Sequence, residues 1–180
     1  QTYTTATSVT KYASLPAGFN LINDGLNNNI GSANNPNKPF NEPGLKTAGW
    51  AVVYNEAEND TFVVSTSWLD TTGISVNRWF VIPAITNISA NSVLTWLAKA
   101  PDANYADGYE VYGTTNLNAS SAQDFAVGDR LFVLADANTA GGGEKNVWTR
   151  RSINIGAFAG QTLRFAFRNN SKDRYQLWID

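Results

Sequence analysis

Nine short runs rich in β-branched and aromatic residues follow one another from residue 50 to the end of the chain. Clusters of Gly, Asn, Asp and Pro separate them, and no window keeps a 3.6-residue apolar period for three turns. This spacing predicts an all-β sandwich, with helix at most incidental. The runs are WAVVY (50–54), TFVVST (61–66), RWFVIPAI (78–85), VLTWLAK (93–99), YEVYGTT (109–115), RLFVLADA (130–137), VWTRRSINI (147–155), TLRFAFRN (162–169) and RYQLWID (174–180).

Side chains alternate across a strand, so the parity of the last two runs predicts their faces. In run 162–169, Leu163, Phe165 and Phe167 are expected to face the core and the arginines at 164 and 168 the other side. In run 174–180, the odd positions Tyr175, Leu177 and Ile179 are expected inward, which leaves Gln176, Trp178 and Asp180 outward. Each strand is thus predicted to have one apolar and one polar face.

Two runs, 78–85 and 93–99, are apolar on both faces, which predicts central strands buried on each side, with Trp79 and Trp96 in the core. Pro83 cannot donate to a sheet ladder and therefore requires a bulge or a strand end. Residues 1–49 contain NDGLNNNIGSANNPNKPFNEPG and are predicted to be a long loop, because this composition favours turns. The 180 residues are expected to form a single β-sandwich domain.

Composition excludes several classes of function. The 13 basic residues are scattered, so no positive patch suited to nucleic acid is expected. The chain has no Cys and no His, which leaves oxygen ligands and therefore a hard cation such as calcium for any metal site. No apolar run approaches the roughly 20 residues of a membrane span. A start at Gln1, in a chain without Met, is expected of a processed secreted protein or of an excised piece of one.

Several stretches together resemble a known family. They are LPAGFNLINDGL (15–26), STSWLD (65–70), RWFVIPAI with VLTWLAKAPDANYADGYEVYGTT (78–85, 93–115) and WTRRSINIGAFAGQTLRFAFRNNSKDRYQLWID (148–180). In this order they resemble the cleaved-adhesin or choice-of-anchor J type domain of secreted and surface-anchored bacterial proteins. The resemblance implies a jelly-roll β-sandwich of the galactose-binding-like and MAM-like kind, a role in adhesion or carbohydrate binding, and structural calcium.

One candidate calcium site lies in the loop before run 109–115, where Asp102, Asn104 and Asp107 precede Gly108. The pattern D-x-N-x-x-D-G misses the helix–loop–helix calcium motif by one residue and lacks its distal Glu. The alternative is a turn in which Asp107-Gly108 leads into the strand.

A second candidate site combines Asp24, Asn27 and Asn29 with Asp180, because the resemblance implies calcium near the first three. Asp180 can complete this site only if the last strand ends beside the N-terminal loop. Otherwise these side chains form Asx turns that hold an irregular loop.

Trp178 is the candidate sugar-stacking residue, with Arg164, Arg168 and Gln176 expected beside it on a polar sheet face. The alternative is that the arginines stack on the indole only to finish the surface.

The function expected from these observations is a non-catalytic, extracellular adhesion or carbohydrate-binding module of a larger secreted or surface-anchored protein. Its partners would be a glycan or a host or surface protein, and it would be a monomeric module with calcium as a structural ion. The alternative is a structural or accessory module beside a catalytic or anchoring domain. A glycoside hydrolase is the least favoured interpretation, because its acid and base are defined by a spatial separation of two carboxylates that sequence does not supply.

Overall fold

The computed structural model describes residues 9–13, 15–23, 49–69, 73–126 and 128–180. In this part of the chain three short helical segments accompany the strands: η1 (Ala103–Tyr105), α2 (Ala122–Ala126) and η2 (Gly156–Phe158). No helix among these residues has the length and apolar character needed to cross a membrane. The strands are β1 (Val9–Ala13), β2 (Asn20–Asn23), β3 (Trp50–Asn55), β4 (Asp60–Ser65), β5 (Arg78–Val81), β6 (Val93–Lys99), β7 (Tyr109–Thr114), β8 (Asp129–Leu134), β9 (Thr149–Asn154), β10 (Arg164–Asn169) and β11 (Leu177–Ile179).

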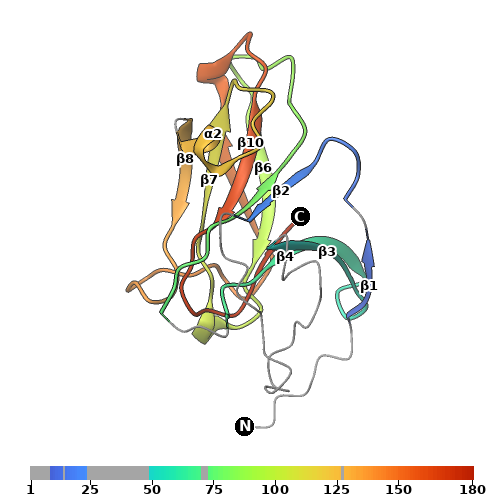
Figure 1. The fold of residues 1–180 in the computed structure, drawn as a ribbon, viewed down its shortest axis with the longest axis vertical. Helices are drawn as coiled ribbons and strands as arrows, with labels where there is room; N and C mark the ends of the chain where they lie inside the picture. Colours follow the sequence, from blue (N-terminus) through green and yellow to red (C-terminus); the bar gives the residue numbers. More distant parts are fainter. Residues whose placement is uncertain (1–8, 14, 24–48, 70–72, 127) are drawn as a thin grey trace.

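These strands form two antiparallel sheets, which confirms the predicted all-β jelly-roll sandwich. One sheet has six strands in the order β1-β3-β4-β11-β6-β9, and the other has five in the order β2-β5-β10-β7-β8 (Figure 1). The last two strands of the chain, β10 and β11, belong to different sheets. β11 lies between β4 and β6, and it pairs Trp178 with Val64 on one side and with Lys99 on the other.

The main core fills the space between the two sheets. Phe165 and Phe167 of β10 and Leu177 and Ile179 of β11 are buried, as parity predicts. Tyr175 is an exception: it packs with Trp178 on the other side of the six-stranded sheet. The buried residues of the main cluster are Trp50, Val63, Phe80, Trp96, Ala98, Tyr109, Val111, Phe167, Leu177 and Ile179.

The segment that contains α2 covers the outer face of the five-stranded sheet. Phe125 stacks on Trp79 of β5 with ring centroids 5.6 Å apart, and Tyr112 and Ala166 complete the cluster. This cover explains why every residue of β5 is buried, as predicted. For β6 the prediction of burial on both faces is wrong, because Val93 and its outward neighbours have no comparable cover among the described residues.

The prediction that residues 1–49 form only a loop is also wrong. Within this segment β1 pairs with β3, and β2 pairs with β5, so each adds an edge strand to one sheet. Pro83 lies just beyond the end of β5 at Val81, which is the strand end that its missing N–H requires.

Candidate functional site

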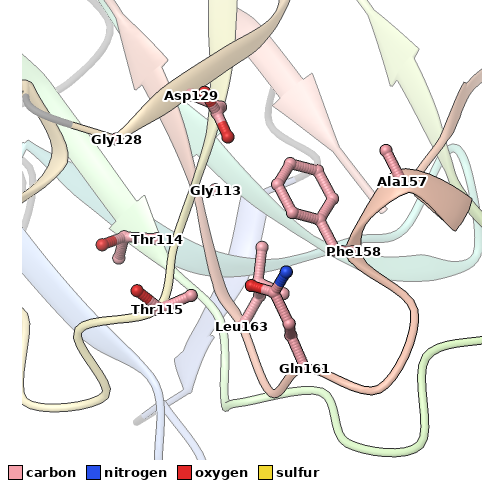
Figure 2. Close-up of a pocket in the computed structure, with 9 residues that line it drawn as sticks. All are labelled: Gly113, Thr114, Thr115, Gly128, Asp129, Ala157, Phe158, Gln161 and Leu163. Atoms are coloured by element: carbon pink, nitrogen blue, oxygen red, sulfur yellow. The ribbon is translucent and has the colours of Figure 1, made fainter.

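A hollow of about 330 Å³ opens at the end of the sandwich where β7 ends and β8 and β10 begin. In Figure 2, Thr114 and Thr115 lie on one side and Phe158 on the other. The volume is near the lower end of the range for small-molecule pockets, about 300 to 1,000 Å³. The lining residues are Gly113, Thr114, Thr115, Gly128, Asp129, Ala157, Phe158, Gln161 and Leu163.

Two glycines allow close packing at this end of the sandwich. Gly113 occupies an inward position of β7, where a Cβ atom would lie 3.1 Å from Leu131 Cδ1 and 3.3 Å from Leu163 Cδ2. A Cβ on Gly128 would lie 2.5 Å from the Gly113 carbonyl oxygen, closer than real side chains come. The absence of a Cβ at these two positions therefore permits close packing beside the hollow, where buried Leu163 is one of the lining residues.

The groups around the hollow combine one aromatic ring with several free polar side chains. Phe158 of η2 is half-buried and packs against the cluster that contains Ile155 and Leu163, which fixes its ring at the rim. Thr115, Asp129 and Gln161 are exposed, and their side chains form no hydrogen bond with other described residues. An aromatic ring beside hydroxyl, carboxylate and amide groups is the combination that can bind the apolar face and the hydroxyls of a sugar.

The four residues expected to form one sugar-binding face do not lie together. Arg164 and Arg168 are on the outer face of the five-stranded sheet, whereas Trp178 belongs to the six-stranded sheet. Arg164 donates to the carbonyl oxygen of Ala119 at 2.9 Å, and Arg168 donates to Glu110 at 2.9 Å. The expectation of one shared sugar-binding face is therefore wrong. It placed the last two strands, β10 and β11, in one sheet, whereas they belong to different sheets.

Trp178 lies outward as predicted, but its ring has neighbours on both sides. Its indole stacks on Phe62 of β4 at 4.7 Å, and Lys99 Nζ of β6 lies 5.0 Å from its centroid. Because β4 and β6 flank β11 on opposite sides, these two side chains cover opposite faces of the ring. Gln176 was expected outward but is buried, and its amide oxygen accepts the Trp178 Nε1–H. No open stacking face remains on Trp178.

The loop before β7 does not assemble its three predicted calcium ligands. Asp102 caps η1 by accepting the amide of Asn104 at 2.8 Å, and the Asn104 side chain is exposed. Asp107 is fully buried and accepts from Asn169 Nδ2 at 3.2 Å. The Asp102 and Asp107 carboxylates therefore lie in different surroundings, one in the cap of η1 and the other in the interior. This geometry fits the interpretation of the loop as a turn.

Asp107 lies in a buried cluster that also contains the guanidinium of Arg78. Burial, opposed in part by hydrogen bonds from Ser67 and Asn169, raises the pKa of Asp107 to about 7. Arg78 is also buried and donates Nη1–H to the Thr66 carbonyl oxygen at 2.7 Å. Burial lowers the pKa of Arg78 to about 10, against the attraction of Asp107. A guanidinium at this place disfavours a second cation, so these residues do not fit a calcium site.

Of the remaining metal candidates, only Asp180 is among the residues that the structure describes. Asp24, Asn27 and Asn29 lie outside the described residues. Asp180 follows β11, where burial and the negative charge of Asp60 raise its pKa. Within the described ranges no three acidic side chains gather around a common point.

Solved structures identify the architecture. The K1 cleaved adhesin domain of Lys-gingipain from Porphyromonas gingivalis W83 matches with a TM-score of 0.63 at 20% sequence identity, over 96% of this chain and 92% of that one. The chain has the cleaved-adhesin fold. The K3 domain matches with a TM-score of 0.56 at 21% identity, over 92% and 90% of the two chains. The K2 domain matches with 0.59 at 16% identity, over 95% and 91%. No protein-family model and no curated protein matches the sequence.

On this cleaved-adhesin fold, two buried carboxylates are held by arginines. Glu144 binds Arg151 through two hydrogen bonds of 2.7 and 3.0 Å and also accepts from the Tyr109 hydroxyl at 3.1 Å. Glu110 accepts from Arg130 and Arg168 on the outer face of the five-stranded sheet. Both acids therefore stabilise the fold through ion pairs.

Sequence reasoning missed the hollow. Its polar residues Thr115, Asp129 and Gln161 lie just after β7, at the start of β8 and just before β10, and Phe158 stands in the small-residue stretch GAFAGQT. A lone phenylalanine between alanines gives no periodic signal. These residues come to one end of the cleaved-adhesin sandwich only because β7 pairs with both β8 and β10.

Proposed function

We propose that the protein is a non-catalytic, extracellular binding module that recognises a glycan within a larger secreted or surface-anchored protein. The observation that carries this proposal is the hollow at the end of the sandwich, which Phe158 lines together with the polar side chains of Thr115, Asp129 and Gln161. The name of the matched domains, cleaved adhesin, supports an adhesive role. An extracellular location also agrees with the resemblance of the sequence to surface-anchored bacterial domains.

The shape of the hollow favours a glycan over a protein partner. Protein interfaces of ordinary size bury about 800 Å² on each side and depend on a central apolar or aromatic patch. The large exposed apolar residues of the described chain are scattered over several elements: Val93, Tyr105, Leu117, Val133 and Val147. A small concave site with polar edges instead suits one or two sugar rings.

Replacing Gln161 with alanine is expected to weaken glycan binding by about two- to tenfold, the usual effect of losing a neutral hydrogen bond to a ligand. Because the side chain is exposed and has no partner in the described protein, the melting temperature should stay unchanged. A glycan array screened with the wild type identifies the ligand, and titration calorimetry then compares the variants.

Gln123→Ala is the matched control, because Gln123 is equally exposed but lies on α2, away from the hollow. Equal affinity of the Gln161→Ala and Gln123→Ala proteins would remove the hollow as the site. A wild-type protein that binds nothing across the array would favour the accessory role, in which the module supports a neighbouring domain.

The surroundings of the buried carboxylates support the absence of catalysis. Glu110 and Glu144 are held by arginines, and Asp107 is enclosed beside Arg78. A glycosidase needs two carboxyl groups that face each other across a cleft about 5 to 10 Å wide. Asp129 is the carboxylate at the hollow, and no second one lines it among the residues that the structure describes.

We also propose a stabilising calcium ion held by the segment that contains Asp24, Asn27 and Asn29, on the basis of the family resemblance and their oxygen ligands. Calcium at about 100 times its dissociation constant should then stabilise the protein by about 2.7 kcal/mol, and chelator should reverse this. Asp24→Asn is expected to abolish the shift in melting temperature, whereas Asp102→Asn should keep it. A response lost with Asp102 instead would return the site to the loop before β7.

A further inference from the structure

We infer that the hollow selects sugars without an acid group, so that a neutral or amino sugar binds and its uronic acid counterpart is rejected. This inference rests on the proposed glycan-binding function and adds the charge class of the ligand. It follows from the ionisable groups that the fold places at the rim and from those that it directs elsewhere.

Asp129 is the one ionisable side chain among the residues that line the hollow. It stands at the first position of β8, is exposed, and has no ion-pair or hydrogen-bond partner among the described residues. The remaining polar lining comes from Thr114, Thr115 and Gln161, which are neutral. A ligand in the hollow therefore meets a net negative charge.

The nearest arginines in sequence and in the sheet are directed away from the hollow. Arg130 lies on the outer face of the five-stranded sheet, where its Nη1–H donates to Glu110 Oε1 at 3.0 Å. Arg164 donates to the carbonyl oxygens of Ala119 and Gly18, which holds its guanidinium on that same outer face. Neither is part of the lining, and among the described residues no cation lines the hollow to bind a sugar carboxylate or sulfate.

The chemistry of an ionised carboxylate then sets the selectivity. Asp129 offers only acceptors, which suits the hydroxyl hydrogens of a neutral sugar and suits an ammonium group even better. A sugar carboxylate placed a few ångströms away is repelled, and near a protein surface this repulsion corresponds to a loss of at least about tenfold in affinity. Salt screens the effect, so the selectivity should weaken as ionic strength rises.

The test compares three glycans that differ only in the terminal sugar: a neutral hexose, the corresponding uronic acid and the 2-amino sugar. The wild type is expected to bind the uronic acid at least about tenfold more weakly than the hexose, and the amino sugar at least as tightly as the hexose. Asp129→Asn should bring the three affinities close together. Asp129→Lys should reverse the order, because the exposed start of β8 tolerates lysine and the rim then carries a positive charge.

Asp173→Asn is the control for net charge. It removes the same charge at a turn beyond the far end of β10, and its φ of 49° suits asparagine. This variant should keep the wild-type order. If the wild type binds the uronic acid as well as the hexose, or if Asp129→Lys leaves the order unchanged, the inference fails while glycan binding stands. If none of the three glycans binds, and the wider array is also negative, the proposed function fails with it.

Discussion

Replacing Glu144 with alanine is expected to lower the free energy of unfolding by about 3 kcal/mol, toward the lower end of the cost of breaking a buried ion pair. The Glu144 side chain is fully buried, and its removal leaves the Arg151 guanidinium and the Tyr109 hydroxyl without their acceptor. Arg151 keeps 24% of its side chain exposed, so water can replace part of the lost interaction. In a domain of this size the change corresponds to a melting temperature lower by about 6 to 12 °C.

Urea unfolding of the wild type and the variant measures this difference directly. Glu56→Ala is the matched control, because Glu56 is exposed in the β3–β4 turn and should change stability by less than about 0.5 kcal/mol. Equal stability of the Glu144→Ala and Glu56→Ala proteins would contradict the stabilising role of Glu144 as the buried acceptor for Arg151 and Tyr109.

The second large effect is a loss of stability as the pH rises from about 4 to about 7. Burial raises the pKa of Asp107 from its ordinary value of 3.8 to about 7, so between these values the folded state binds a proton that the unfolded state has released. The stabilisation by this proton is complete below about pH 4 and is lost as the pH approaches 7. A difference of about three pH units corresponds to about 4 kcal/mol.

Asp107→Asn should remove this dependence, so the stability of the variant relative to the wild type increases steadily from pH 4 to 7. The slope is the informative quantity, because in this pH range the folded wild type holds Asp107 largely protonated, so neither protein gives the buried Arg78 a full counter-charge. Asp136 is the other charged group that influences Asp107. Asp102→Asn is the control and should keep the slope caused by Asp107. Parallel curves for the wild type and Asp107→Asn, measured by urea unfolding, would contradict the assignment.

Much of the fold could be predicted because local patterns determine strands. Each of the nine predicted runs contains one strand, from β3 to β11, and the inward parity of Phe165 and Phe167 is confirmed. β1 and β2 could not be predicted, because they are two short edge strands whose partners are about 40 to 60 residues away. Partner choice depends on the whole sheet and not on the strand itself.

The site could not be predicted for the same reason. Parity assigned Trp178 and Arg168 each to an outward face, correctly, but it cannot tell that these faces belong to different sheets. Likewise Asp102 and Asp107 are five residues apart, yet one lies at the surface and the other in the interior. The predicted sites combined side chains that are close in sequence. The hollow is instead lined by residues from segments that only the completed sandwich brings together.

The position of β11 has a consequence for how the protein is made. The six-stranded sheet consists of a β1-β3-β4 half and a β6-β9 half, and residues 177–179 join them. A ribosome that has released everything up to Asn169 has therefore exposed two separate half-sheets whose inner edges lack their central partner. Contacts this distant in sequence form slowly, and unpaired edges invite aggregation. We expect this module to complete its folding only after residues 177–179 have been synthesised, because the two half-sheets have no shared strand until then.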